Sequence, residues 1–154
     1  MCIYNIIKKY ISIILLLLLL LFTGCSKSTL IYDSQSDYSS LADNSSYGCV
    51  KMSFDNLDGK EIRAFKAKAH KLYRFDYTCK IEKGDLRIYF TDSENRVIQD
   101  LKWISEEAAE IDSTGGEIRV NEVGGWRDVK SSDDEIKIVI ESKKAEGSVE
   151  LEWE

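Results

Sequence analysis

Among the residue types that carry out catalysis, histidine is scarce in this 154-residue chain. His70 is the only histidine, and a serine–histidine–aspartate arrangement needs a histidine as its base. It stands in Lys68-Ala69-His70-Lys71, which predicts a turn, and nothing nearby supplies an activated nucleophile. We therefore expect no catalytic residues, and an exposed, inert His70.

Two acidic runs contain oxygen ligands that a cation could use: Asp92, Glu94 and Asn95 in the first, and Asp133, Asp134 and Glu135 in the second. Calcium takes about six to eight oxygens, and neither run has the spacing of a calcium loop. Asp and Asn also serve turns, so we predict solvated turns, with no metal and no cofactor. A hydrolase with paired carboxylates stays open as a lesser alternative, because spacing along the chain singles out no pair.

Trp126 is the candidate ligand-binding residue. It follows Gly124-Gly125 in a predicted loop. An exposed aromatic side chain beside glycines can stack on a sugar ring or anchor a peptide. The alternative is a loop tryptophan that folds back over the end of the domain.

Residues 1–24 have the layout of a secretory signal peptide. Lys8 and Lys9 form the positive region, Ile11–Phe22 the apolar region, and Thr23-Gly24 the small residues before cleavage. A membrane-spanning helix needs about 20 apolar residues, and this run is shorter. We therefore predict export from the cytoplasm.

The end of this segment, Leu21-Phe22-Thr23-Gly24-Cys25, resembles the lipobox of bacterial lipoproteins. Phe22 stands where that family usually has leucine. The resemblance implies cleavage before Cys25 and a diacylglycerol on its thiol, and two acyl chains anchor a protein stably to a membrane. It also implies, from Ser26, that the protein is not retained at the inner membrane if the cell has an outer one. An ordinary secreted protein with an incidental Cys25 is the alternative.

Cys49 and Cys79 are a candidate disulfide, because paired cysteines of exported proteins are often oxidised. Cys79 is in register with the apolar residues of its run, whereas Cys49 is out of register with Val50 and Met52. Two separate thiols therefore remain the alternative.

Charge excludes one class of partner. The formal net charge is −6, and removing residues 1–24 takes away Lys8 and Lys9 but no acid, which brings it to −8. Nucleic-acid binding needs clustered basic residues, so we expect no nucleic-acid partner.

Residues 25–47 predict a lipidated cysteine followed by a flexible tether. Eight of the 22 residues from 26 to 47 are serine, and the segment shows no apolar periodicity.

Residues 48–154 predict one all-β domain. Short runs alternate apolar and polar residues, which is typical of strands with one buried face. The clearest runs are 50–54, 73–79, 86–90, 136–140 and 149–153. Turn signals at Asp58-Gly59, Lys83-Gly84 and Glu146-Gly147 separate them. The pattern favours an antiparallel β-sandwich or barrel of seven to eight strands.

The run from Gly84 to Ser93, followed by Val97-Ile98, resembles small lipid-anchored bacterial β-sandwich proteins. So does a closing hairpin formed by 136–141 and 149–153. The resemblance implies a jelly-roll-like β-sandwich and an envelope location, and it brings no catalytic residue.

The sequence as a whole predicts a lipid-anchored, extracytoplasmic protein with a non-catalytic binding or structural role and a membrane partner through Cys25. The alternative is a carbohydrate- or peptide-binding module that uses Trp126, with cell-wall polysaccharide or an envelope protein as partner.

Overall fold

The computed structural model describes residues 28–105, 109–111, 117–119 and 122–154. The predicted signal peptide and Cys25 lie outside the described residues. No helix long and apolar enough to cross a membrane occurs in the described part of the chain.

The described chain is built from antiparallel strands. Their bounds are β1 Leu30–Asp37, β2 Ser40–Asp43, β3 Cys49–Lys66, β4 Leu72–Thr91, β5 Val97–Ser105, β6 Ala109–Ile111, β7 Glu117–Arg119, β8 Glu122–Lys130 and β9 Glu135–Trp153. Seven of them form the main sheet, in the order β1-β3-β9-β4-β5, with β2 also paired to β3 and β8 to β4. Within the described ranges, β6 and β7 form a separate two-stranded sheet.

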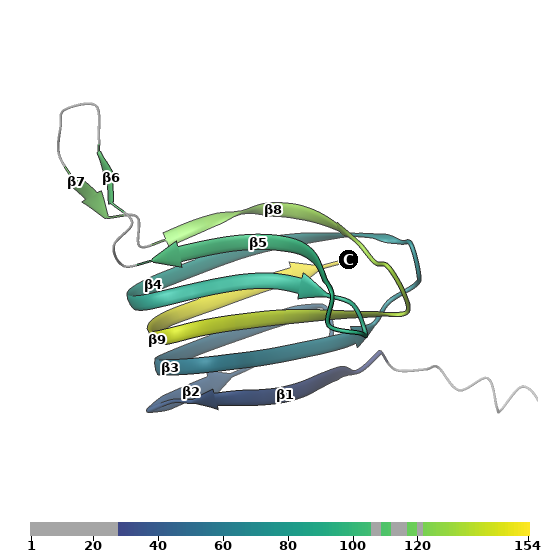
Figure 1. The fold of residues 1–154 in the computed structure, drawn as a ribbon, viewed down its shortest axis with the longest axis horizontal. Helices are drawn as coiled ribbons and strands as arrows, with labels where there is room; N and C mark the ends of the chain where they lie inside the picture. Colours follow the sequence, from purple (N-terminus) through teal and green to yellow (C-terminus); the bar gives the residue numbers. More distant parts are fainter. Residues whose placement is uncertain (1–27, 106–108, 112–116, 120–121) are drawn as a thin grey trace, which may run out of the picture.

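The main sheet folds over itself because its three central strands run through two layers (Figure 1). In the first layer, β1 and β5 flank residues 57–66 of β3, 85–91 of β4 and 135–142 of β9. In the second layer, β2 and β8 flank residues 49–54 of β3, 72–81 of β4 and 147–153 of β9. The result is an antiparallel β-sandwich, as the sequence predicts.

The bends lie where the strand register shifts, and Gly84 shows why. This residue has φ 71°, and a Cβ there would lie 2.5 Å from the carbonyl oxygens of Lys143 and Lys144. Only glycine takes this conformation without steric cost. On the neighbouring strand, the Ser142 hydroxyl donates a 3.0 Å hydrogen bond to the Leu57 carbonyl.

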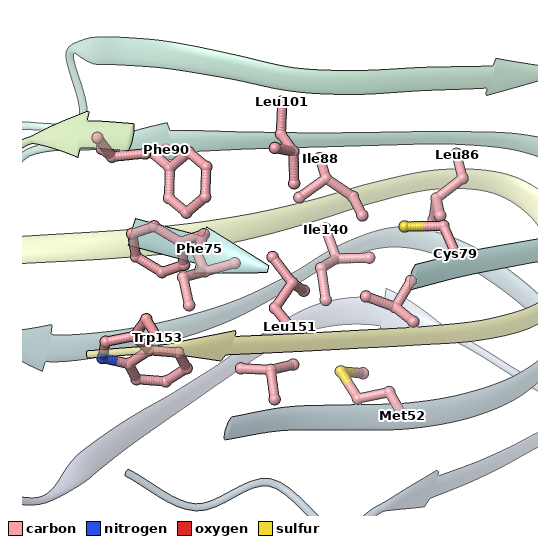
Figure 2. Close-up of a cluster of buried hydrophobic side chains, with 14 of the residues drawn as sticks. Met52, Phe75, Cys79, Leu86, Ile88, Phe90, Leu101, Ile140, Leu151 and Trp153 are labelled. Atoms are coloured by element: carbon pink, nitrogen blue, oxygen red, sulfur yellow. The ribbon is translucent and has the colours of Figure 1, made fainter. Parts of the chain in front are cut away.

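The core fills the space between the layers with the inward side chains of the alternating runs (Figure 2). Rings from opposite layers meet directly: Phe75 and Phe90 have centroids 4.5 Å apart, and Phe65 stacks on Trp153 at 4.8 Å. Offset aromatic pairs of this kind add to the hydrophobic gain from burial.

One part of the predicted topology is wrong. The runs 136–141 and 149–153 do not form a closing hairpin, because both belong to β9, the central strand between β3 and β4. Likewise, the runs 73–79 and 86–90 are two halves of β4. Gly84 in β4 and Gly147 in β9 lie between these runs. Each bends a continuous strand, whereas the sequence predicts a chain reversal.

The predicted tether is also wrong for residues 30–43. These residues form β1 and β2, so the sandwich begins at Leu30 and not at residue 48. The segment lacks apolar periodicity because its side chains meet polar partners on β3. Ser34 and Ser36 both donate hydrogen bonds to the Glu61 carboxylate, which is 1% exposed.

Arg63, 2% exposed, completes this buried network. Its guanidinium lies 2.6 Å from Asp43 of β2 and 3.1 Å from Glu61, and 4.8 Å from the ring centroid of Tyr32 on β1. Buried charges persist when they are paired and hydrogen-bonded in this way, so the network attaches both N-terminal strands to the sandwich.

Candidate functional site

Trp126 lies on the outer face of the second layer, and its side chain is 51% exposed. The predicted loop is a strand: Gly124 and Gly125 belong to β8, and neither has a positive φ. Trp126 is the register partner of Asp76 on β4, and Asp76 is in turn the partner of Glu152 on β9. One row across three strands thus brings an indole and two carboxylates to the same face.

Arg74 holds the indole on one side. Its guanidinium carbon lies 4.5 Å from the centroid of the Trp126 ring, a cation–π contact, and its Nε lies 3.8 Å from Asp76 Oδ1. In the strand register, Arg74 lies opposite Asp128, which follows Trp126 by two residues, whereas Gly124 precedes Trp126 by two. Half of the indole surface remains open to solvent.

A groove of about 370 Å³ runs beside Trp126. Its lining comes from three strands: Asp76, Tyr77 and Thr78 of β4, Gly124 and Gly125 of β8, and Glu150 and Glu152 of β9.

Gly124 leaves room for this groove, whereas Gly125 leaves room for the side chain of Tyr77. A Cβ on Gly125 would come within 3.1 Å of the Tyr77 hydroxyl, closer than ordinary packing allows. At Gly124, a Cβ would lie 3.4 Å from the Tyr77 carbonyl oxygen and 3.6 Å from Thr78 Oγ1, which is ordinary contact distance. A larger side chain at Gly124, which shares the outward face with Trp126, would fill space that a ligand could otherwise occupy.

Cys49 lies at one end of the same face. Its sulfur and the carboxylates of Glu150 and Glu152 lie within 4.8 Å of one another. Burial, followed by the charges of Glu152 and Glu150, raises the pKa of the Cys49 thiol, which favours its neutral form. Glu150 is already paired with Lys51 at 2.9 Å. We therefore assign no metal to this cluster.

The candidate disulfide between Cys49 and Cys79 is not formed. Cys49 is the partner of Glu152 and faces outward, whereas Cys79 is the partner of Val149 and is buried in the core. Strand β9 lies between them, which separates the two backbones by about 9.5 Å. A disulfide needs Cα atoms closer than about 7 Å.

His70 is exposed in the turn between β3 and β4 with φ 61°, as expected. The two acidic runs lie in neighbouring turns that hydrogen-bond to each other. Asp133 accepts a 3.1 Å bond from the Ser93 amide, and Asp92 accepts a 3.3 Å bond from the Ser132 hydroxyl. Asp92 is buried and also pairs with Arg96 at 2.8 Å, so it is a structural residue of the turn and not a solvated one.

Sequence reasoning identified Trp126 but missed the groove beside it. Alternation places Asp76, Thr78, Glu150 and Glu152 on wet faces, but it does not say which wet faces adjoin. Only the order β9-β4-β8 brings these residues to Trp126.

Comparisons with known proteins complete the description. A scan against family models finds no match, and neither does a search of curated proteins. Among solved structures, a family 27 carbohydrate-binding module described for specific mannan recognition is 15% identical, with a TM-score of 0.49 over 81% of this chain and 85% of that one. A family 35 module from an environmental isolate is 12% identical, with a TM-score of 0.41 over 84% and 85%.

A third structure is the module from lichenase 5A of Cellvibrio mixtus, in complex with cellotriose. It is 13% identical, with a TM-score of 0.37 over 78% of this chain and 86% of that one. Identities at this level concern the fold alone, and none of these overlaps is close enough to carry an argument about the ligand of this chain.

Proposed function

We propose that this chain is a non-catalytic polysaccharide-binding domain that holds neutral sugar units against Trp126. The half-exposed indole beside a polar groove carries the proposal. The apolar face of a sugar ring would stack on the part of the indole that Arg74 leaves open. Sugar hydroxyls would then donate hydrogen bonds to the carboxylates of Asp76 and Glu152.

Charge favours a neutral ligand. Among the described residues, the groove is lined by three carboxylates, those of Asp76, Glu150 and Glu152, and by no basic side chain. An acidic polysaccharide would be repelled there, whereas carboxylates are good acceptors for uncharged hydroxyl groups.

The carboxylate pair on β9 does not favour hydrolysis. A glycosidase of the usual kind needs one carboxyl group kept protonated by an apolar environment and a second that stays ionised. Glu152 is exposed, and Glu150 pairs with Lys51 on an open sheet face. Neither lies in an apolar pocket of the kind that such a general acid requires.

The test is affinity electrophoresis through gels that contain neutral polysaccharides, with polygalacturonate as the acidic comparison. Trp126→Ala should weaken binding about fivefold or more, since aromatic stacking contributes about 1 kcal/mol beyond burial. Leu72→Ala is the matched control, because Leu72 is another exposed apolar residue of the second layer. Equal retardation of the wild type and Trp126→Ala, or retardation by polygalacturonate alone, would contradict the proposal.

We also propose that a diacylglycerol on Cys25 anchors the domain outside the cytoplasm. The signal-peptide layout and the lipobox resemblance support this. Because β1 begins at Leu30, five residue steps separate Cys25 from the sandwich, a span of at most about 17 Å. The domain would therefore lie close to the bilayer. Cys25→Ala should abolish incorporation of labelled fatty acid and release the protein from membranes, and an unchanged membrane fraction would argue against the anchor.

A further inference from the structure

A second groove, of about 260 Å³, lies on the outer face of the first layer, opposite to Trp126. Its floor contains Ile62 of β3, Val139 of β9 and the ring of Tyr89 of β4, which are neighbours in one row of the sheet. Val139 and Tyr89 are largely buried although they point away from the core. Because these three apolar side chains are neighbours in one row, they give the groove a continuous apolar floor.

Thr91 lies in the wall of this groove and has an unexplained polar atom. The residue is 3% exposed, and its hydroxyl oxygen has no hydrogen-bond partner among the described residues. Buried hydroxyl groups in folded proteins are nearly always paired, so the unpaired hydroxyl of Thr91, a residue that lines the groove, indicates a missing partner.

Two amide side chains on the rim of the groove, those of Asn95 and Gln35, each keep one polar group available for a ligand. Asn95 accepts a 2.8 Å hydrogen bond from Lys137 through its oxygen, which leaves its NH₂ group to donate. Gln35 donates at 3.1 Å to Asp33, which leaves its oxygen to accept. The Thr91 hydroxyl can do either. The groove thus offers a donor, an acceptor and a group that can act as both.

The ammonium group of Lys60, which lines the groove, is already paired. Lys60 lies 3.5 Å from Glu141, and the Tyr89 hydroxyl is its hydrogen-bond partner, the first cause of its raised pKa. An anion would find no unpaired charge here. A ligand that matches the groove is therefore uncharged, with a small apolar group and an amide.

We infer that this groove binds an N-acetylated hexosamine, with the acetamido methyl on Ile62 and Val139 and the amide at Thr91 and Asn95. An acetamido group supplies an apolar methyl, a carbonyl acceptor and an N–H donor in one unit, which is the combination that the groove offers. The site is independent of the Trp126 groove, so the domain would hold ligands on two opposite faces.

Titration of the full mature chain with N-acetylglucosamine, followed by NMR chemical shifts, tests this inference. Saturable shifts of the Thr91 and Asn95 amides are expected with N-acetylglucosamine, and much weaker ones with glucose, which lacks the acetamido group. Thr91→Val keeps the side-chain shape and removes the hydroxyl. It should weaken binding about tenfold, because the ligand amide loses its partner, while thermal stability should stay equal or rise.

Trp126→Ala separates the two proposals, because it should leave N-acetylglucosamine binding unchanged even if polysaccharide retardation is lost. Three outcomes would overturn the inference: no saturable shift with N-acetylglucosamine, equal affinity for glucose, or unchanged affinity in Thr91→Val. A large loss of stability in Thr91→Val would also overturn it, since the hydroxyl would then have a partner within the fold.

Discussion

Phe75 and Phe90 belong to the same strand, yet their ring centroids lie 4.5 Å apart. Fifteen residue steps along an extended strand cover about 50 Å. The two rings meet because β4 bends at Gly84 and returns over its own first half as part of the other layer. The core contact between Phe75 and Phe90 therefore requires the bend in β4.

Replacing Gly84 should therefore be costly. Gly84→Ala would force a side chain into a left-handed backbone conformation and against two carbonyl oxygens, so we expect unfolding free energy to fall by about 1–3 kcal/mol. Urea unfolding measures the change. Gly124→Ala is the matched control, because its φ is not positive and its Cβ would make only ordinary contacts. If the two variants are equally stable, the bend does not depend on this glycine.

The buried network should attach the N-terminal strands. In the described network, Arg63 is the positive charge that contacts both Asp43 and Glu61. Arg63→Met removes it and leaves the buried Glu61 carboxylate without an opposite charge. Breaking a buried pair in this way typically costs about 3–5 kcal/mol. Thermal unfolding measures the loss, and Lys51→Met, which breaks the exposed pair with Glu150, should have a much smaller effect. A small effect of Arg63→Met would mean that β1 and β2 are held mainly by backbone pairing.

The same network predicts an acid-sensitive contribution. Burial alone would raise the pKa of Asp43, but hydrogen bonds from Ser45 and Arg63, with the Arg63 charge, lower it below its usual 3.8. A carboxylate with a lower pKa in the folded state stabilises the fold fully above its unfolded pKa and loses this contribution as pH falls through the folded value. The stability difference between the wild type and Asp43→Asn should thus be constant above about pH 5 and shrink below pH 3.8.

Unfolding curves at several pH values test this expectation. Asp37→Asn, at an exposed position at the end of β1, is the control for the loss of one carboxyl group outside the buried network. A difference between wild type and Asp43→Asn that persists at low pH would show that the two side chains differ in packing and not in charge.

The cysteines should remain reduced. A mature chain with Cys25→Ser, unfolded without reducing agent, should yield two titratable thiols, because Cys49 and Cys79 face opposite sides of the second layer. In the folded protein, Cys79 should be protected by burial and Cys49 should react slowly, since its raised pKa keeps little thiolate at neutral pH. Mass spectrometry of the alkylated chain counts the thiols. A chain that takes up no alkyl group and is two hydrogens lighter than the reduced, unalkylated chain would reveal a bridge.

The amino-acid sequence by itself determined which side chains enter the core. Alternation separated Phe75 and Leu151 from the charged residues beside them, and both are buried. The reason is local: the pleat of a strand sends successive side chains to opposite faces, whatever the strand pairs with. The all-β class and the sandwich follow from the same periodicity.

Only the tertiary structure decided what pairs with what. A glycine such as Gly84 or Gly147 permits either a hairpin or a folded-over strand, and the choice depends on packing between layers that are distant in sequence. The serines of β1 carry no apolar signal because the partners they meet, Glu61 and Arg63, are themselves polar and buried. The groove beside Trp126 likewise exists only once β9, β4 and β8 lie side by side, since sheet order is set by the whole core and not by any one strand.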